Sequence, residues 1–303
     1  MNPAFSVIFF TTASGAGYGM LMIAGLWAVL GRLPAAPGPA AMAMALALVL
    51  ITAGLLSSTA HLGHPERAWR AVTQWRSSWL SREGIMALVT YLPALAFSAS
   101  WVAPAYAPFG LAASGALSAV CAAATIYTTA MIYRSLKPIR QWHDPWVVPN
   151  YLLLGLASGA LMIQAVLSAF GHADNALRIA SCLAVAAALA AKLAYWRSID
   201  RATSPTTAFA LGMGGKHARV VEWPHTEENY LLKEMGFAIG RKHARRLRAL
   251  ALIIGFLVPG LAVVLGWAAV AAISALVGIT VERWLFFAEA RHTVALYYRD
   301  QGG

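Results

Sequence analysis

Long apolar runs alternate with short polar segments along this whole chain. A helix that crosses the hydrocarbon core of a membrane needs roughly 20 mainly apolar residues. The runs cover residues 4–31, 40–61, 82–103, 108–134, 147–170, 175–197, 248–266 and 270–292. The pattern therefore predicts an all-α, polytopic integral membrane protein with eight transmembrane helices in a bundle. We expect residues 1–303 to form a single membrane domain.

The order of the runs leaves a four-plus-four arrangement open. Pro259 falls in the seventh run where Pro93 falls in the third, and a long polar segment precedes each of these two runs. Sequence similarity between the two halves is too weak to establish a repeat. Only the neighbourhood of Gly266 and Trp267 separates the last two runs.

Composition agrees with a membrane protein, because 59% of the residues are hydrophobic and 12% are charged, against about 25% charged in a soluble domain. The net charge of +11 is distributed unevenly. Nineteen of the 23 Lys and Arg residues lie in the even-numbered loops and the C-terminal tail, and only Arg32 and Arg178 lie in the odd-numbered loops. This asymmetry follows the positive-inside rule. It indicates contact with membrane lipid rather than nucleic acid, and it predicts a bacterial inner-membrane protein with both termini in the cytoplasm.

The longest polar segment, residues 198–247, is predicted to be a cytoplasmic loop between the sixth and seventh helices. Thr226 can cap a short helix whose first turn holds Glu227 and Glu228, where acidic side chains are favourable. Loops of this length are usually functional or disordered. Two interpretations stay open: an amphipathic helix on anionic lipid, or a docking site for a cytoplasmic subunit.

The loop between the second and third runs concentrates residues that could carry chemistry. His61 ends the second run, Arg67 and Arg70 follow three residues apart, and Glu83 opens the third run. Histidine exchanges protons near neutral pH, and arginines favour a reduced, anionic ring. The mixture suits transfer of protons and electrons to a lipid-soluble ring. The alternatives are helix capping by His61, a favourable helix-dipole contact for Glu83 and ordinary positive-inside charge for the arginines.

A second cluster lies in the last run, at Glu282, Arg283, Glu289 and His292. At 1.5 Å of rise per residue, Glu282 and Arg283 lie roughly 18 Å from Val270 on the outer side, inside the hydrocarbon region. Ionisable residues at that depth face the bundle interior and pair with one another. We predict that this cluster is either a proton path or a structural ion pair.

The chain has few candidate metal ligands, and we predict no metal site. Its two cysteines, Cys121 and Cys182, are too few for an iron–sulfur cluster, which usually takes four thiolates. A b-type cytochrome would require two histidines on facing helices, for which only His61 and His292 are placed. A secondary transporter would require broken helices and polar groups at the midplane, where the chain offers Pro259 and Glu282.

One motif resembles a known family. His61-Leu-Gly-x-Pro-x-Arg67-Ala-Trp, followed by Leu80-Ser-x-Glu83, is similar to the membrane anchor subunits of dimethyl sulfoxide reductase-type molybdoenzymes. The resemblance implies an eight-helix anchor that binds ubiquinone or menaquinone and carries neither haem nor an iron–sulfur cluster. It implies two partners, an iron–sulfur subunit with four clusters and a molybdopterin catalytic subunit. His61 resembles the quinone-linked histidine of that family, and Glu83 resembles its acidic residue at the start of helix 3.

The position of the basic face distinguishes two branches of the family that this chain resembles. In the reductase that names the family the catalytic subunits face the periplasm, whereas the motif here lies on the face predicted to be cytoplasmic. This resembles the anchors of cytoplasmic sulfite dehydrogenases. We therefore predict a quinone-binding anchor that passes electrons from a partner iron–sulfur subunit to the quinone pool during sulfite oxidation. The alternative is a quinol-oxidising anchor of a terminal reductase. His61 and Glu83 would handle protons, and Arg67 and Arg70 would contact the quinone or the partner.

Overall fold

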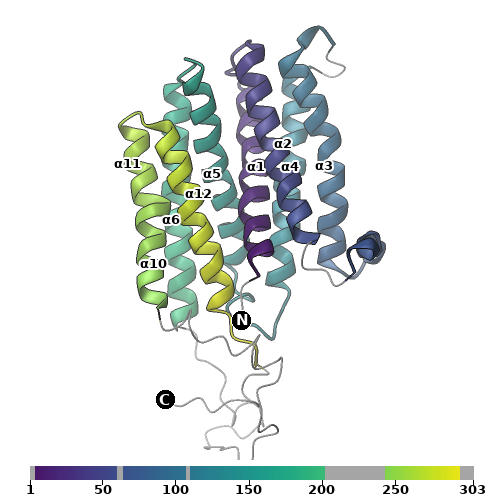
Figure 1. The fold of residues 1–303 in the computed structure, drawn as a ribbon, viewed down its shortest axis with the longest axis vertical. Coiled ribbons are helices and arrows are strands. Elements are labelled where there is room, and N and C mark those ends of the chain that lie inside the picture. Colours follow the sequence, from purple (N-terminus) through teal and green to yellow (C-terminus); the bar gives the residue numbers. More distant parts are fainter. Residues whose placement is uncertain (1–3, 60–63, 107–109, 202–242, 294–303) are drawn as a thin grey trace, which may run out of the picture.

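A computed structural model describes residues 4–59, 64–106, 110–201 and 243–293. Within these residues eight helices are long and apolar enough to cross a membrane, which confirms the predicted all-α, eight-helix fold. Figure 1 shows them side by side with their axes roughly parallel. The spans are α1 (Phe5–Val29), α2 (Pro37–Thr59), α3 (Trp79–Val102), α4 (Leu111–Arg134), α5 (Val147–Ala169), α6 (Asn175–Arg201), the segment Ala244–Val264 and α12 (Ala268–Ala288).

The seventh span is continuous but not uniform. It consists of α10 (Ala244–Leu252), a π-helical turn at η3 (Ile253–Leu257) and α11 (Val258–Val264). Pro259 has no backbone N–H to donate four residues back, to the carbonyl of Gly255, so the α-helical ladder cannot continue unchanged across this point. Gly266, with a φ of 80°, ends the span, which confirms the predicted break before the last helix.

The helices of the bundle end at two opposite faces. The N-terminal face carries the start of α1, the segment 135–146 and the end of α12. It also carries η1 (Pro65–Gln74), a 3₁₀ helix beside the start of α3. The opposite face carries the ends of α1, α3, α5 and α11, the starts of α2, α4, α6 and α12, and η2 (Pro104–Tyr106). His61, Thr226 and most of the predicted loop 198–247 lie outside the described residues, so what the sequence predicts for them stays a prediction.

Glycine ends α1, α5 and the seventh span at the opposite face. At the end of α1, Gly31 has a φ of 66°, its N–H donates to Ala28 at 3.1 Å, and the N–H of Arg32 donates to Trp27 at 2.9 Å. This is the Schellman pattern, which satisfies helix carbonyls that would otherwise lack a partner. Gly171 ends α5 by the same pattern.

An ion pair with an additional hydrogen bond joins the first and fifth loops at the opposite face. The Asp174 carboxylate accepts hydrogen bonds from Arg32 Nη2 at 2.9 Å and from Trp27 Nε1 at 2.9 Å. The hydrogen bond from Arg32 is the largest of the effects that lower the pKa of Asp174 to about 2. The first and fifth loops are therefore tied together by a charged pair at ordinary pH.

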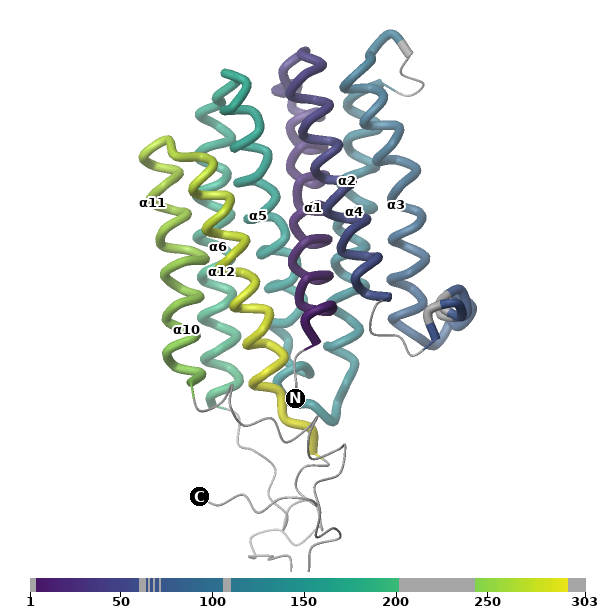
Figure 2. Tube along the Cα trace, in the orientation of Figure 1, coloured from purple at the N-terminus to yellow at the C-terminus, as the bar shows by residue number. Residues whose placement is uncertain are grey.

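The helices pack as two groups of four. The first group is α1–α4, and the second holds α5, α6, the seventh span and α12, with α1 and α5 packed together at the join. Figure 2 shows these two groups side by side. A Cβ atom on Gly19 would overlap the backbone of Gly155, and one on Gly159 would overlap the backbone of Gly19. The small residues therefore permit backbone contact between α1 and α5.

Candidate functional site

Glu83 lies in the first turns of α3, close to the N-terminal face. Ser78 caps this helix, and its hydroxyl accepts a hydrogen bond from the N–H of Ser81 at 3.4 Å. The cap fixes the direction of the first turn, so that Glu83 faces the bundle and is only 5% exposed. Its carboxyl group interacts with the hydroxyl of Thr129 on α4. The Oε1 atom is buried and has no hydrogen-bond partner among the described residues.

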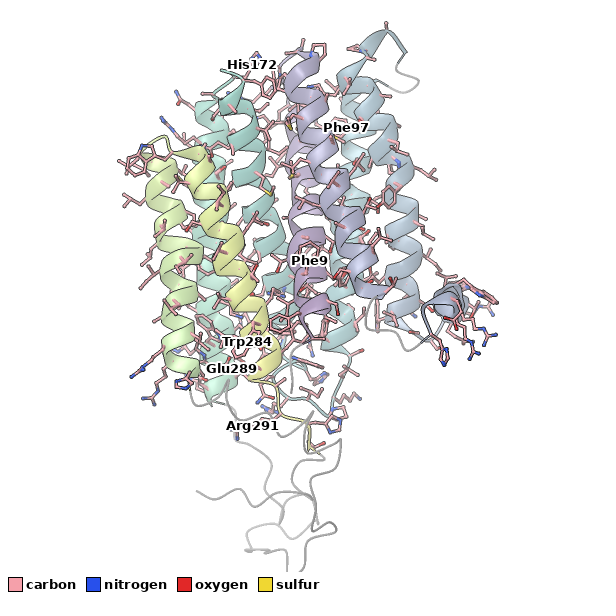
Figure 3. All side chains as sticks on the ribbon, in the orientation of Figure 1. Phe9, Phe97, His172, Trp284, Glu289 and Arg291 are labelled. Carbon is pink, nitrogen blue, oxygen red and sulfur yellow. The ribbon has the colours of Figure 1, made fainter. Side chains whose placement is uncertain are left out.

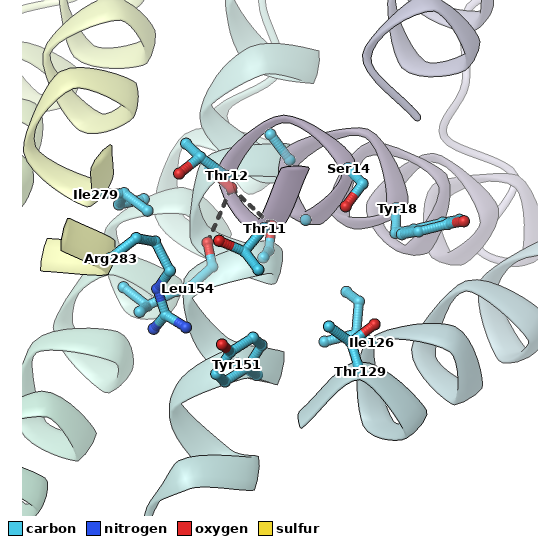
Figure 4. Close-up of a pocket in the computed structure, with 14 residues that line it drawn as sticks. Thr11, Thr12, Ser14, Tyr18, Ile126, Thr129, Tyr151, Leu154, Ile279 and Arg283 are labelled. Atoms are coloured by element: carbon cyan, nitrogen blue, oxygen red, sulfur yellow. Dashed lines mark hydrogen bonds between the residues drawn. The ribbon is translucent and has the colours of Figure 1, made fainter. Parts of the chain in front are cut away.

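Thr129 lines a pocket between α1, α4, α5 and α12 (Figure 4). Its empty volume, counted out to its open mouth, is about 390 Å³. Apolar side chains form part of the wall. The polar part carries four buried atoms for which the described residues offer no hydrogen-bond partner: Thr12 Oγ1, Tyr18 OH, Tyr151 OH and Arg283 Nη1.

The hydroxyl groups of α1 fall into two kinds. The hydroxyl of Thr11 donates to the carbonyl of Val7 at 3.0 Å, and that of Ser14 donates to Phe10 at 2.6 Å, so each is satisfied within its own helix. Thr12 and Tyr18 have no such partner among the described residues. Since an unsatisfied buried polar group costs free energy, the unpaired atoms indicate a cavity that accepts a polar ligand or water. Figure 4 shows Arg283 near one end of the lining and Tyr18 near the other.

Arg283 connects this pocket to a buried ion network. Its guanidinium lies 4.1 Å from the centre of the Tyr151 ring, and its Nε donates to Glu282 Oε2 at 2.6 Å. The other carboxylate oxygen of Glu282 accepts a hydrogen bond from Lys192 on α6. Lys192 in turn lies over the ring of Tyr195 at 4.2 Å. Glu282 therefore pairs with its sequence neighbour Arg283 and also with Lys192 of α6, a member of the network that the sequence pattern did not reveal.

Glu289 lies at the N-terminal face, apart from the pocket (Figure 3). Glu289 accepts a hydrogen bond from Arg248 Nε at 2.8 Å, and Arg248 also pairs with Asp200 at 2.6 Å. Burial raises the pKa of Glu289, an effect that the Arg248 guanidinium opposes. His292 forms an isolated backbone bridge with Ile139. These contacts tie the end of α12 to α6, α10 and the segment 135–146.

Arg67 of the sequence motif and Arg70, which follows the motif, lie on η1, outside the pocket lining. The Arg67 side chain is exposed, with its Nε 3.8 Å from Glu66 Oε1, and Arg70 lies over the ring of Trp69. Both side chains are thus available at the N-terminal face beside α3. Their predicted contact with a quinone or a partner subunit stays a prediction, as does the role of His61.

An aromatic layer separates the pocket from the N-terminal face. Tyr133 of α4 stacks on Tyr151 at 5.7 Å between ring centres and meets Trp142 and Phe286 edge-on. Trp142 Nε1 donates to the carbonyl of Phe286 at 3.0 Å, which fixes the indole over the end of α12. Because the Tyr151 side chain is buried behind these rings, the layer shields it from water at this face.

Sequence reasoning identified Glu83 and Arg283 but missed the hydroxyl groups that share their surroundings. Thr12, Tyr18, Thr129 and Tyr151 sit in apolar runs where a hydroxyl is unremarkable. The sequence feature that could have revealed them is the high density of hydroxyl groups on one helix, in Thr11-Thr-Ala-Ser14 and at Tyr18.

Comparison with known proteins agrees with this architecture. Residues 1–288 match the family described as DMSO reductase anchor subunit (DmsC). The chain is also 36% identical to a sulfite dehydrogenase subunit of Allochromatium vinosum, over 99% of each chain. The two matches cover all eight spans. The chain therefore belongs to the DMSO reductase anchor subunit family, whose members are membrane anchors of molybdoenzymes.

Proposed function

We propose that this chain is the quinone-linked anchor of a molybdenum–iron–sulfur oxidoreductase that oxidises sulfite and delivers the electrons to the membrane quinone pool. The observation that carries the proposal is the pocket with its four unpartnered polar atoms beside Glu83. The full-length similarity to a sulfite dehydrogenase subunit supports sulfite as the donor.

The pocket residues fit the chemistry of a quinone ring. The hydroxyl groups of Thr12, Tyr18 and Tyr151 and the free Nη1 of Arg283 are donors suited to carbonyl oxygens, which accept hydrogen bonds. Ile126 and Leu154 in the same wall suit the apolar parts of a ring. When bound, a quinone would accept two electrons and two protons at its carbonyl oxygens.

The protein's part in this chemistry is to bind the ring, exclude water and supply protons. We place the proton-handling group at Glu83 Oε1, because this atom is buried and unpartnered among the described residues, and the carboxyl group lies beside Thr129 of the pocket lining. Arg283 favours negative charge at the opposite end of the pocket, and Tyr133 closes the N-terminal side. His61 would then exchange protons between Glu83 and the water at the membrane surface, as its place in the motif suggests.

Electrons would enter from a partner, in keeping with the anchor family. The proposed partners are an iron–sulfur subunit with four clusters and a molybdopterin catalytic subunit. We assign the N-terminal face to the cytoplasm, because the described arginines of η1 and its surroundings gather there and the positive-inside rule favours that orientation. The partners would dock on this face of a bacterial inner membrane.

Purification of the tagged chain from its own membranes in mild detergent tests this proposal. We expect two further subunits to co-purify, with iron and molybdenum, and the complex to reduce added ubiquinone or menaquinone when supplied with sulfite. A chain that purifies without molybdenum would contradict the anchor role in this organism. A complex that oxidises quinol but leaves sulfite untouched would instead support a terminal reductase, which the name of the matched family favours.

A further inference from the structure

The short helix η1 lies at the edge of the bundle rather than within it. Among the described elements it packs mainly on the start of α3, and Figure 2 shows it beyond α3 with its axis across the direction of the spans. Arg82 of α3 fixes this position from below η1. Its Nε donates to the carbonyl of Trp75 at 2.9 Å, and its Nη2 donates to that of Arg76 at 2.8 Å, directly after η1. The short helix is therefore held at the level where the spans end.

One side of η1 is apolar and turns toward the lipid-facing surface of α3. A 3₁₀ helix has three residues per turn, so Trp69, Val72 and Trp75 lie in one line. Val72 covers Gly84 of α3, since a Cβ atom on that glycine would lie 3.4 Å from Val72 Cγ1. Four residues along the same face of α3, Leu88 is 65% exposed. Trp69 and Trp75 flank the contact and are 64% and 53% exposed, so both indoles face the surroundings of the bundle.

The adjoining side of η1 is basic. Arg70 and Arg76 each lie over the indole ring of the preceding tryptophan, at 5.5 Å and 5.4 Å from the ring centre. Both arginines are exposed. Residues 64–82 hold four arginines and one acidic residue, Glu66, and that carboxylate lies 3.8 Å from Arg67. Arg70 and Arg76 therefore keep an uncompensated positive charge among the described residues of this segment.

We propose that the two tryptophan–arginine pairs of η1 bind the headgroups of acidic phospholipids at the N-terminal face. Indole rings are favoured at the boundary between hydrocarbon and headgroups, and a guanidinium can donate two parallel hydrogen bonds to a phosphate. Basic residues next to a span are attracted to an anionic leaflet. For Arg70, this assignment is an alternative to the contact with a quinone or a partner subunit that the sequence predicts.

The position of η1 favours lipid over a soluble subunit as the occupant. Its apolar line continues the exposed leucine face of α3, so the indoles reach the space that acyl chains occupy. The arginines over those indoles then lie at the level of the phosphates. Figure 3 shows the nitrogen-bearing side chains of η1 pointing outward from the bundle, which leaves them accessible to headgroups beside α3.

Native mass spectrometry of the full chain in mild detergent tests this assignment. Titration with phosphatidylglycerol, and separately with phosphatidylcholine of the same acyl chains, gives an apparent Kd for the tightest-bound lipid of each kind. We expect the wild-type chain to bind phosphatidylglycerol more tightly. In Arg70→Gln/Arg76→Gln its Kd should rise roughly tenfold or more, since each basic residue near an anionic surface contributes a factor of about five. The Kd for phosphatidylcholine should stay within about twofold.

The matched control is Arg245→Gln/Arg246→Gln on α10, which removes two exposed arginines at the same face and should leave both Kd values within about twofold. Equal affinity of the wild-type chain for the two lipids, or an equal effect of the control, would overturn the proposal. Because Arg70 and Arg76 are exposed, their double variant should unfold at the wild-type temperature, which separates lost binding from misfolding. A double variant with an unchanged Kd that no longer co-purifies with partner subunits would make η1 a protein-docking surface and would also overturn the lipid site.

Discussion

At the scale of single residues, the buried triad of Lys192, Glu282 and Arg283 holds two cationic groups around one carboxylate. Removal of the carboxylate by Glu282→Gln would leave two like charges together in the interior. Breaking a buried ion pair from one side typically costs about 3–5 kcal/mol. We expect this variant to be strongly destabilised, as measured by thermal unfolding of the purified chain. Lys192→Met leaves the Glu282–Arg283 pair intact and should cost less.

The informative result is which of these two variants loses more stability. A network that acts only by filling space would make the two substitutions equally harmful, because both side chains are fully buried. Greater damage from Lys192→Met than from Glu282→Gln would contradict a charge-paired triad.

The residue scale also shows where sequence reasoning succeeds. Two adjacent ionisable residues deep in the last run must pair or face a cavity, so Glu282 and Arg283 were predictable. Lys192 was visible in its run, but its partner lies 90 positions away, and helix periodicity carries no information on that contact. The same applies to Tyr18 and Tyr151, whose hydroxyl groups become notable only when the fold leaves them buried without partners among the described residues.

At the scale of elements, the contact between α1 and α5 depends on glycine. Gly19→Ala and Gly159→Ala would each force a Cβ atom into the backbone of the facing helix. Overpacking of this kind typically costs about 1–3 kcal/mol, so we expect a lower thermal midpoint for both variants. Gly260→Ala on α11 is the control, since a Cβ atom there meets nothing within 4 Å. Unchanged stability of both the Gly19→Ala and the Gly159→Ala variant would contradict direct backbone contact between α1 and α5.

The spans themselves were predictable, because length and hydropathy alone separate membrane helices from loops. The predicted and observed limits differ mainly at the interfaces: the sixth helix extends to Arg201, and the second begins at Pro37. Charged residues can continue a helix beyond the hydrocarbon, and proline is tolerated in a first turn. The π-helical turn before Pro259 was not predicted, since hydropathy does not report how a backbone accommodates a missing N–H.

At the scale of the whole molecule, the two groups of four helices contribute different residues to the proposed site. The α1–α4 group holds Glu83, whereas α5 brings Tyr151, and α6 and α12 bring the ion triad of Lys192, Glu282 and Arg283. The pocket lies where the two groups meet. No sequence run predicts this location, because it follows from which helices pack together. The motif singled out Glu83, which lies near this place, and its role in the site stays a prediction.

The most direct test of this account is the ratio of quinone-coupled to dye-coupled turnover in the assembled complex carrying Glu83→Gln. The glutamine keeps the shape and polarity of the side chain but cannot carry a proton at Oε1. General acid–base groups typically contribute about 10²–10⁴-fold to a rate, so quinone-coupled turnover should fall by that order while dye-coupled turnover, which bypasses this chain, stays unchanged. Normal quinone turnover in Glu83→Gln, with assembly intact in the same membranes, would contradict the proposed site.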